Sequence, residues 1–398
     1  MRELAAATAL LALLAACSKP PDDPALEAPI VNTDPGAPYA SPTRAFQGIP
    51  CIERAPSGRL WANWYAGGPG EGPENYVVLV TSGDDGRTWS DPVLVIDPPS
   101  FVRAFDACVW LDPVGSLWLF WAQGAGKFDG RSGVWAISTA EPDSAQPTWT
   151  RPRRLADGIM MNKPTVLSTG EWLLPAAVWT NIPPDIEQVN EKYKLGLSLE
   201  RMKTLVHDLN HRSGAHLLMS NDNGTSFTLI AGPRVPDSRF DEHMLIERQD
   251  QSWWVLVRTR YGIGQSISAD RGQTWSAGTN SGIAHADARF FIRRLASGNL
   301  LLVRHNSPEG MARSHLTAEI SRDDGRTWTG GLLLDERTRV SYPDGTQAPD
   351  GRIYVIYDRE RTGDREILFA TFREEDVEAG RCVTEQCGLR GLIDRAAP

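Results

Sequence analysis

Four aspartates in this chain of 398 residues recur in one short motif, and a repeated carboxylate is a natural candidate for acid–base chemistry. The motif is Ser-x-Asp-x-Gly-x-x-aromatic, and its aspartates are Asp84, Asp222, Asp270 and Asp323. An aspartate in such a stretch accepts hydrogen bonds from backbone N–H groups of its own loop, as in Asx turns. The glycine two residues later supplies the positive φ of a tight turn, and the aromatic ring packs back against a sheet. These aspartates are therefore predicted to hold turns together and not to catalyse.

The elements around the motif are short strands. Each copy follows a run of apolar, β-branched and aromatic residues and precedes another such run, so each copy is a hairpin turn. Copies begin at Ser82, Ser220, Ser268 and Ser321, and a decayed copy begins at Ser138; the last three full copies lie 48 and 53 residues apart. A period near 50 residues with four strands per unit is typical of propeller blades. The sequence thus predicts an all-β fold, a six-bladed β-propeller of four-stranded antiparallel blades, with blades near 46–92, 100–152, 158–230, 236–278, 284–330 and 336–376.

The domain limits follow from this count. The propeller is expected to occupy residues 43–378, and residues 379–398 are expected to form a C-terminal tail. A strand from residues 28–48 is predicted to close the sixth blade, because closure hides free strand edges. The segment 183–210 is the one helical-looking insertion, and we expect it to cap a mouth of the propeller.

The N-terminus is predicted to be a targeting signal. Residues 1–17 hold one early arginine, an apolar run and Cys17, which fits a secretory signal. The string "LAAC" resembles a bacterial lipoprotein cleavage box, which implies lipid on Cys17; the alternative is a plain signal peptide. Ser18 is not the aspartate that usually retains lipoproteins at the inner membrane, so an exported protein anchored to the outer membrane is favoured. Residues 18–42, rich in Pro, Ala and Asp, are expected to be an extended tether.

Composition excludes some functions. The net charge of −9 argues against a nucleic-acid partner, because phosphate binding needs a basic surface. Cys382 and Cys387 lie close enough in sequence for a local disulfide in an oxidising compartment, whereas Cys51 and Cys108 lie in strand-like runs and are expected to be buried thiols. No Cys/His spacing resembles a zinc site, and no nucleotide loop or Ser–His–Asp motif is present. No cofactor is expected, although a structural calcium ion stays open.

The repeated motif resembles the Asp box, or BNR repeat, of the sialidase superfamily, and the likeness covers most of residues 46–376. The chain is similar to a divergent member. Asp boxes also occur in proteins that do no chemistry, so fold alone does not give function. For a bacterial sialidase the resemblance implies a Tyr–Glu nucleophile pair, three arginines that hold the substrate carboxylate, and an aspartic acid/base.

Four residues carry this likeness into a site. "FDEHMLIERQDQSWWVLVRTR" is similar to the segment that supplies the glutamate and the second arginine, which gives Glu242 and Arg258. "ARSHLTAEIS" gives the third arginine as Arg313, and "VSYPDGTQAPDGRIYVIYD" gives the nucleophile as Tyr342. Two guanidiniums can fork onto one carboxylate. A carboxylate beside a phenol can take its proton and so create a nucleophile.

Two departures from the family pattern stand out. Where the first arginine of a "RIP" motif should be, this chain has Gly48 in "QGIP". Arg44 or Arg54, the nearest arginines in sequence, is the candidate to take the place of that arginine. The loop that should hold the acid/base aspartate, "GGPGEGPENY", offers Glu71 and Glu74 instead.

Three hypotheses follow. The first is an exo-acting glycosidase that removes a terminal acidic sugar, with Tyr342 activated by Glu242 and with Glu71 or Glu74 as the acid. The second is a lyase on uronate-containing glycans, such as rhamnosyl-glucuronate, with Tyr342, His243 or His285 as the base. The third is a non-catalytic glycan-binding surface lipoprotein. All three have an acidic glycan as partner, membrane contact only through the lipid, and a monomeric chain.

Overall fold

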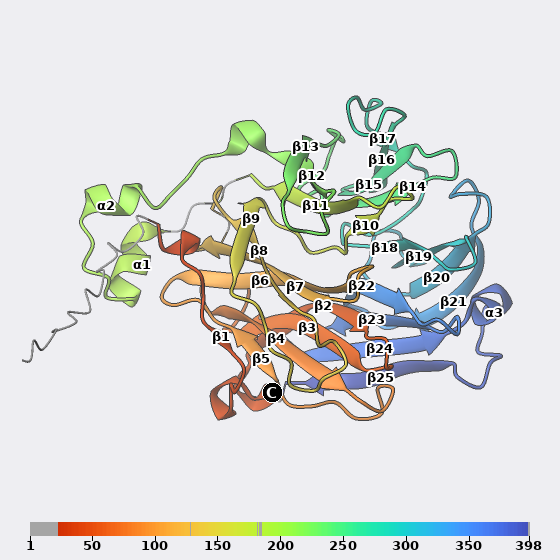
Figure 1. Cartoon of the computed structure of the whole chain (residues 1–398), viewed down its shortest axis with the longest axis horizontal. Helices are drawn as coiled ribbons and strands as arrows, with labels where there is room; N and C mark the ends of the chain where they lie inside the picture. The colour runs from red at the N-terminus through yellow and green to blue at the C-terminus, as the bar shows by residue number, and fades with distance from the viewer. Residues whose placement is uncertain (1–22, 128, 181, 183–184, 397–398) are drawn as a thin grey trace, which may run out of the picture.

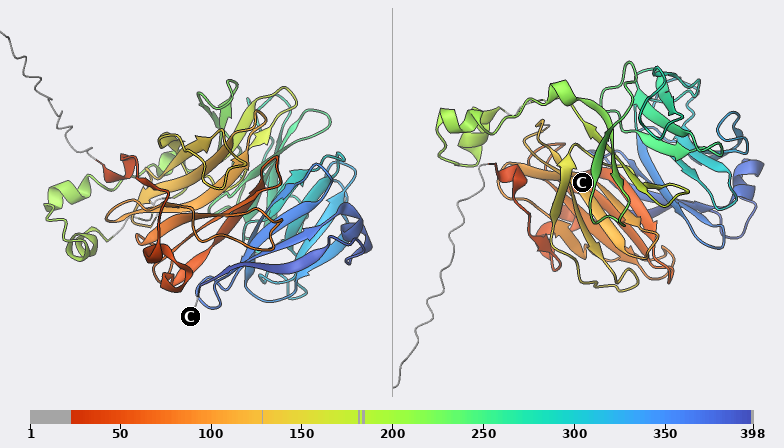
Figure 2. Two further views of the ribbon diagram at one scale, coloured as in Figure 1. Left: turned by 60° about the horizontal axis from the view of Figure 1, so that its bottom comes forward. Right: turned by 45° about the horizontal axis from the view of Figure 1, so that its top comes forward.

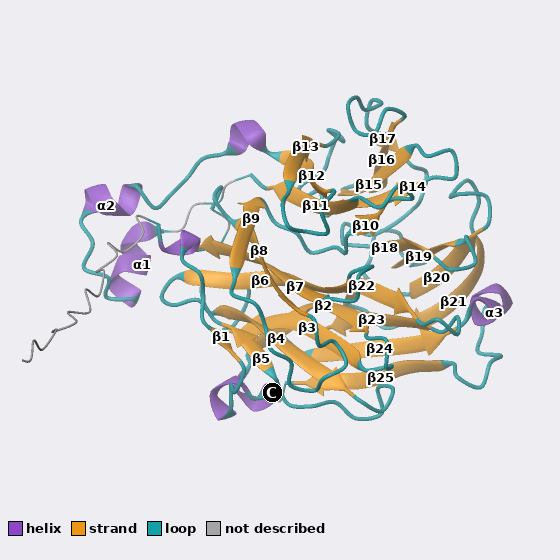
Figure 3. Ribbon diagram, in the orientation of Figure 1, coloured by secondary structure: helices purple, strands orange, loops and turns teal. Residues whose placement is uncertain are grey.

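The fold is a six-bladed propeller built almost wholly of strands (Figures 1 and 3). The computed structural model describes residues 23–127, 129–180, 182 and 185–396. Its six antiparallel sheets follow one another along the chain, and each sheet is made of consecutive strands apart from the edge strand β1. The predicted fold class is therefore confirmed.

Every blade holds four strands, and the first blade carries β1 as a fifth. In chain order the strands are β1 (Val31–Asn32), β2 (Phe46–Arg54), β3 (Leu60–Gly67), β4 (Asn75–Ser82), β5 (Leu94–Ile96), β6 (Val102–Leu111), β7 (Leu117–Ala125), β8 (Gly133–Thr139), β9 (Arg153–Asp157), β10 (Thr165–Val166), β11 (Trp172–Val178), β12 (Gly214–Ser220), β13 (Thr228–Ala231), β14 (Met244–Glu247), β15 (Trp253–Thr259), β16 (Gly262–Ser268), β17 (Thr279–Asn280), β18 (Phe291–Arg294), β19 (Leu300–His305), β20 (Leu316–Ser321), β21 (Thr329–Asp335), β22 (Val340–Gln347), β23 (Ile353–Arg359), β24 (Glu366–Phe372) and β25 (Gly388–Arg395). The α-helices are α1 (Ile186–Lys192), α2 (Leu199–Lys203) and α3 (Glu374–Ala379), and the 3-10 helices are η1 (Pro24–Leu26), η2 (Ala37–Tyr39), η3 (Ser41–Thr43) and η4 (Asn210–Arg212).

The first strand of each blade lies toward the centre, where β2 packs against β6 and β22, and β18 packs against β14 and β22. Three of these inner strands, β2, β6 and β22, carry a β-bulge at corresponding points. In each bulge one residue has a positive φ: 59° at Ile49, 47° at Asp106 and 54° at Tyr342. A bulge re-aims a side chain, and a positive φ in residues of this kind marks a functional constraint. All three side chains line one pocket.

The Asp-box turns have the predicted local structure. In the first copy Asp84 accepts hydrogen bonds from Ser82 Oγ at 2.8 Å, from the Thr88 N–H at 2.9 Å and from Thr88 Oγ1 at 2.6 Å. Gly86 has φ 82°, and its N–H donates to Ser82 Oγ at 2.9 Å. The three other copies repeat this pattern around Asp222, Asp270 and Asp323. The prediction of a turn held by its aspartate is confirmed.

The same turns also seal neighbouring blades. A Cβ added to Gly86 of blade one would lie 2.8 Å from a ring carbon of Phe369 in blade six. A Cβ on Gly325 of blade five would lie 2.5 Å from the ring of Trp254 in blade four. Each position therefore requires glycine for two reasons: the backbone has a positive φ, and the preceding blade packs too closely to leave room for a Cβ.

The ring does not close through a shared strand, so the prediction that residues 28–48 complete the sixth blade is wrong. Within those residues β1 pairs with β5 of blade one, and β2 is the inner strand of that blade. The fourth strand of blade six is β25, which pairs with β24. Residues 388–395 of the predicted C-terminal tail therefore belong to the propeller, since they form this strand.

Side chains hold blade six to blade one instead. The Ile49 N–H donates to Asp358 Oδ2 at 2.7 Å, and the Gln47 amide donates to Asp394 Oδ1 at 3.0 Å. Arg44 forms an ion pair with the same Asp394 at 3.2 Å. These buried and part-buried polar contacts tie β2 of blade one, and Arg44 just before it, to β23 and β25 of blade six.

The described part of the predicted tether, residues 23–42, packs on the propeller and is not extended. The Gln123 amide donates to the carbonyl of Ala25 at 3.0 Å and to that of Glu27 at 2.8 Å. Tyr39 donates to Asp97 at 2.8 Å. The predicted signal at residues 1–17, with Cys17, lies outside the described residues and stays a prediction.

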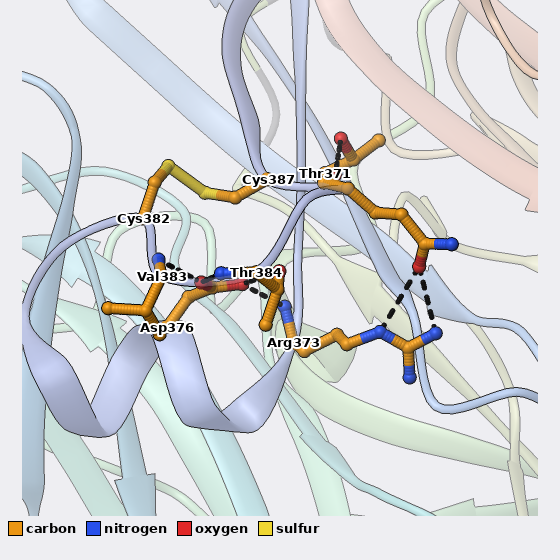
Figure 4. The surroundings of a disulfide bond; sticks show 8 residues. Thr371, Arg373, Asp376, Cys382, Val383, Thr384 and Cys387 are labelled. Carbon is orange, nitrogen blue, oxygen red and sulfur yellow. Dashed lines mark hydrogen bonds between the residues drawn. A yellow bond between two sulfur atoms is a disulfide. The ribbon is translucent and has the colours of Figure 1, made fainter.

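The insertion around 183–210 contains α1 and α2, which project from the side of the propeller in Figure 2. At the other end of the chain a disulfide joins Cys382 and Cys387 (Figure 4). Beside it, Asp376 of α3 accepts hydrogen bonds from the N–H groups of Val383 at 2.6 Å and Thr384 at 2.8 Å. These contacts anchor the turn that leads into β25.

Two further findings concern the described ranges only. No helix in them is long and apolar enough to cross a membrane. No three His, Cys, Asp or Glu side chains within the same ranges are grouped so as to hold a metal ion.

Candidate active site

One pocket at the centre of the propeller gathers residues from all six blades. Its volume is about 190 Å³. The lining residues are Ile49, Tyr65, Glu71, Arg103, Phe105, Asp106, Met161, Trp179, Phe240, Glu242, Arg258, Arg313, Tyr342 and Arg361. Five of the predicted site residues, Glu71, Glu242, Arg258, Arg313 and Tyr342, are thus brought together from distant segments of the chain. A larger cavity of about 440 Å³ lies toward the other end of the inner strands and contains none of them.

Tyr342, Glu242 and Arg258 form a hydrogen-bonded set. The Tyr342 hydroxyl donates to Glu242 Oε1 at 3.1 Å. Arg258 Nη1 donates to the same Glu242 oxygen at 2.7 Å and to the Tyr342 hydroxyl at 3.1 Å. Within the described residues, the other oxygen of Glu242 is buried and has no hydrogen-bond partner. The carboxylate is therefore in place to receive the phenolic proton.

The backbone on both sides of this set is locked. Arg289, which is wholly buried, donates to the carbonyls of Tyr342 and Pro50 at 2.8 Å and to that of Met161 at 3.0 Å. Asn162 donates to the Glu242 carbonyl at 2.9 Å. Tyr342 and Glu242 both have positive φ, 54° and 43°. Such strain persists only where the surroundings fix it, as these contacts do.

Burial raises the pKa of Tyr342 to about 12, with a smaller upward contribution from Glu242, while Arg258, Arg361 and Arg313 lower it. The phenol is therefore neutral near pH 7. It can act as a nucleophile only when a base takes its proton as the new bond forms. Glu242 is the base that touches it.

Two further arginines flank the tyrosine ring. The guanidinium carbon of Arg313 lies 5.6 Å from the ring centroid, and that of Arg361 lies 4.7 Å from it. Arg313 donates to Ser341 Oγ at 3.2 Å and to the backbone carbonyl of Asp287 at 2.7 Å. Arg313 forms no ion pair with any residue that the structure describes. Its positive charge therefore faces the pocket without being neutralised by a direct ion pair among the described residues.

The two glutamates of the predicted acid loop separate. Glu71 lines the pocket, with a side chain 31% exposed, and pairs with Arg361 at 3.2 Å. Glu74 instead points to the insertion and pairs with Lys192 of α1 at 2.7 Å. Only Glu71 is thus positioned to act on a bound ligand.

Asp106 is a pocket carboxyl that the sequence did not reveal. Burial, with smaller contributions from the charges of Glu71 and Glu242, raises its pKa to about 8 against the lowering effect of Arg103. It is therefore protonated near neutral pH and can donate a hydrogen bond. The blade repeat could have located it, because Asp106 in "FDAC" of β6 has the same position at the bulge of its inner strand as Tyr342 in "SYPD" of β22.

The two histidines weighed as lyase bases lie outside the pocket. His243 is buried and its Nε2 contacts the His216 carbonyl at 2.7 Å, and burial lowers its pKa to about 4. His285 stacks on His305 and contacts the Ala288 carbonyl at 3.0 Å, and burial lowers its pKa well below the usual value. Both rings are buried structural groups bonded to backbone.

The arginines considered as replacements at Gly48 also lie elsewhere. Arg44 is buried against Tyr39, Gln47 and Asp394. Arg54 lines the larger cavity at the other end of the inner strands. Arg361, which the sequence did not single out, is the arginine beside Gly48.

Comparison with known proteins agrees with this fold. Residues 58–355 match the family described as BNR repeat-like domain. No curated protein matches the chain. A protein of unknown function from Dyadobacter fermentans is 17% identical, with 82% of this chain and 93% of that chain covered and a TM-score of 0.60.

Sialidases are among the similar solved structures. NanB sialidase from Streptococcus pneumoniae is 12% identical, with 85% of this chain and 70% of that chain covered and a TM-score of 0.62. The intramolecular trans-sialidase from Ruminococcus gnavus is 13% identical, with 86% and 97% covered and a TM-score of 0.61. At these identities the likeness establishes the fold.

Proposed function

The chain belongs to the family of BNR repeat-like domains, and from that membership and its pocket we propose that it is a glycosidase. Specifically, we propose an exo-acting hydrolase of sialidase type that releases a terminal acidic sugar, sialic acid or a related one, from glycans. The observation that carries the proposal is the hydrogen-bonded set of Tyr342, Glu242 and Arg258 inside the central pocket. A binding protein has no need of a phenol with a base on its hydroxyl.

Charge supports an acidic substrate. The pocket holds four arginines and three carboxyls. One of these carboxyls, Asp106, is protonated near neutral pH because its pKa is about 8. The pocket is therefore cationic within a chain whose net charge is −9. A concave cationic site attracts an anionic ligand and disfavours a neutral one.

The size of the pocket and its single-sugar capacity support action at the end of a glycan chain. Its volume of about 190 Å³ is below the ~300–1,000 Å³ of typical drug-sized ligand sites. One sugar ring fits such a space, and the rest of the glycan must leave through the mouth. Glu71, which is partly exposed, lies where the leaving oxygen would emerge, whereas Asp106 is only 2% exposed.

The proposed reaction has two steps. In the first, the Tyr342 oxygen bonds to the anomeric carbon and gives its proton to Glu242, while the leaving oxygen departs with the bonding electrons and takes a proton from Glu71. In the second, water attacks the same carbon and gives a proton to Glu71. Tyr342 then leaves and recovers its proton from Glu242. A neutral phenol suits this task because a carboxylate nucleophile would be repelled by the substrate's own carboxylate.

The test compares the products of two substrate classes. The full-length protein is incubated separately with sialosides and with uronate-terminated oligosaccharides, and the products are identified by mass spectrometry. Free acidic sugar that has gained water supports the proposal. An unsaturated uronate, detected by its ultraviolet absorbance, would replace it with the lyase hypothesis, and binding without turnover of either class would replace it with the glycan-binding hypothesis.

A further inference from the structure

The Arg361 side chain fills the space that a side chain at position 48 would need. A Cβ built on Gly48 would lie 2.3 Å from Cδ and 2.4 Å from Cγ of Arg361, and 2.9 Å from Oδ2 of Asp358. Real Cβ atoms do not approach other heavy atoms so closely, so no side chain fits at position 48 while Arg361 is there. Gly48 is on the inner strand of blade one, and Arg361 is in the loop between β23 and β24 of blade six.

The Arg361 guanidinium reaches the pocket through this gap. It lies 4.7 Å from the Tyr342 ring centroid and pairs with Glu71 at 3.2 Å, while its Nε lies 3.6 Å from Asp358. Its side chain is 18% exposed. The arginine is thus held at its base by Asp358 and presents its charge toward the tyrosine.

The other pocket arginines differ in what they can offer a ligand. Arg258 is committed, because Nη1 binds Glu242 and Nε binds Asp287, each at 2.7 Å. Among the described residues, Arg313 donates hydrogen bonds to a hydroxyl, that of Ser341, and to a backbone carbonyl, that of Asp287. Arg361 also has two carboxylate partners, but they lie farther away, Glu71 at 3.2 Å and Asp358 at 3.6 Å, and Glu71 is partly exposed. A substrate carboxylate is therefore best received between Arg313 and Arg361, on either side of the ring that attacks.

We propose that Arg361 supplies the carboxylate-binding arginine that is missing at position 48, so that this cationic contact has moved from blade one to blade six. The inference rests on the proposed function and names a substrate-binding residue for it. It also gives Gly48 a role, since the glycine keeps open the space through which Arg361 passes. On binding, the substrate carboxylate takes the place of the Glu71 carboxylate at the guanidinium.

The experiment measures binding of free sialic acid and of its methyl ester to the full-length protein by calorimetry. The unsubstituted protein is expected to bind the acid more tightly than the ester. Arg361→Ala should weaken binding of the acid by about tenfold to a hundredfold, the effect of removing one hydrogen bond to a charged group, and should leave ester binding nearly unchanged. Arg359→Ala is the matched control, because Arg359 is in the adjoining strand and pairs with Asp364 and Glu366 outside the pocket.

A relocation variant sharpens the test. Gly48→Arg combined with Arg361→Ala should recover at least tenfold of the lost affinity for the acid, because it removes the Arg361 atoms that fill the space at 48 and leaves Asp358 Oδ2, 2.9 Å from a Cβ there, to shift slightly. Arg361→Lys keeps the positive charge but loses the bidentate guanidinium, so it should give an intermediate loss of affinity. This variant replaces Arg361→Ala in the test if the alanine variant does not fold.

The outcomes separate the two proposals. If the unsubstituted protein neither binds sialic acid nor releases any acidic sugar, the proposed function fails. If it binds the acid and Arg361→Ala keeps the same preference for acid over ester, only the role of Arg361 is overturned. A double variant that binds as weakly as Arg361→Ala overturns the relocation.

Discussion

The Asp-box turns and the central pocket both concentrate aspartates, hydroxyls and residues with positive φ, yet their chemistry is opposite. The aspartates of the turns lie near the surface, half-buried at Asp84, Asp270 and Asp323 and exposed at Asp222. Hydrogen bonds from their own loops, such as the one from Thr88 to Asp84, lower the pKa of each to about 2. In the pocket, burial dominates, and it raises the pKa of Asp106 to about 8 and that of Tyr342 to about 12.

The difference lies in where the partners come from. Asp84 is satisfied by residues within four positions of it. Tyr342 is satisfied by Glu242, 100 residues away, and by Arg258, 84 residues away. Partners from the same loop stabilise the turn. A site assembled from distant blades can bury its groups and shift their pKa values, as catalysis requires. We therefore expect pocket substitutions to change turnover and turn substitutions to change stability.

The largest effect should come from Tyr342→Phe. Removing the hydroxyl removes the nucleophile, so kcat/KM should fall by at least about a thousandfold, within the range known for the loss of catalytic groups. The measurement is turnover of a sialoside together with thermal unfolding, and the midpoint should stay nearly unchanged. Tyr354→Phe is the matched control, because Tyr354 hydrogen-bonds Asp85 at a turn; full activity in Tyr342→Phe would remove the tyrosine from the mechanism.

A smaller effect should separate two neighbouring glutamates. Glu71→Gln should lower kcat by about a hundredfold, because it removes the proposed proton donor. Glu74→Gln should leave kcat unchanged, because Glu74 pairs with Lys192 on the exposed insertion. Steady-state kinetics of both variants on the same substrate decide the assignment, and equal losses would mean that the loop acts as a whole.

Asp106→Asn should change how stability depends on pH. The folded pKa of about 8 lies above the ordinary value of 3.8, so the folded state binds more protons between these pH values. Stability of the unsubstituted protein should therefore fall as pH rises from about 4 to about 8, by at most about 1.4 kcal/mol per pH unit. Denaturant unfolding at pH 5 and pH 8 should show a smaller fall in the Asn variant, and parallel curves would contradict the raised pKa.

The smallest effect on chemistry should come from Asp84→Asn. The variant should lower the unfolding midpoint at pH 7 and leave KM unchanged. Because the folded pKa of about 2 lies below the ordinary 3.8, the contribution of Asp84 is present above about pH 4 and is lost as pH falls toward 2. Thermal unfolding of both proteins at pH 7 and pH 2.5 should therefore show the difference shrinking in acid, and a change in KM would mean that the turn reaches the site.

The sequence predicted the blades well and their closure poorly. A blade is a local unit whose strands and turns follow one another, so the repeat located all six blades, although the last strand of the sixth, β25 (Gly388–Arg395), lies beyond the predicted limit of 376. Closure depends on contacts such as the hydrogen bond between Gln47 and Asp394, two residues that are 347 positions apart in the sequence. No local pattern distinguishes that arrangement from a shared strand.

The sequence by itself determined the fold class, the turn residues and four of the pocket residues, Tyr342, Glu242, Arg258 and Arg313, because each of these lies at a fixed offset from a recognisable motif. Only the tertiary structure decided that Glu71 and not Glu74 faces the pocket, that His243 and His285 are bonded to backbone, and that Asp106 and Arg361 belong to the site. The physical reason is that the burial of a side chain and the charges around it depend on the residues of other blades that pack against it. For Arg361, that neighbour is Gly48, more than 300 residues earlier in the chain.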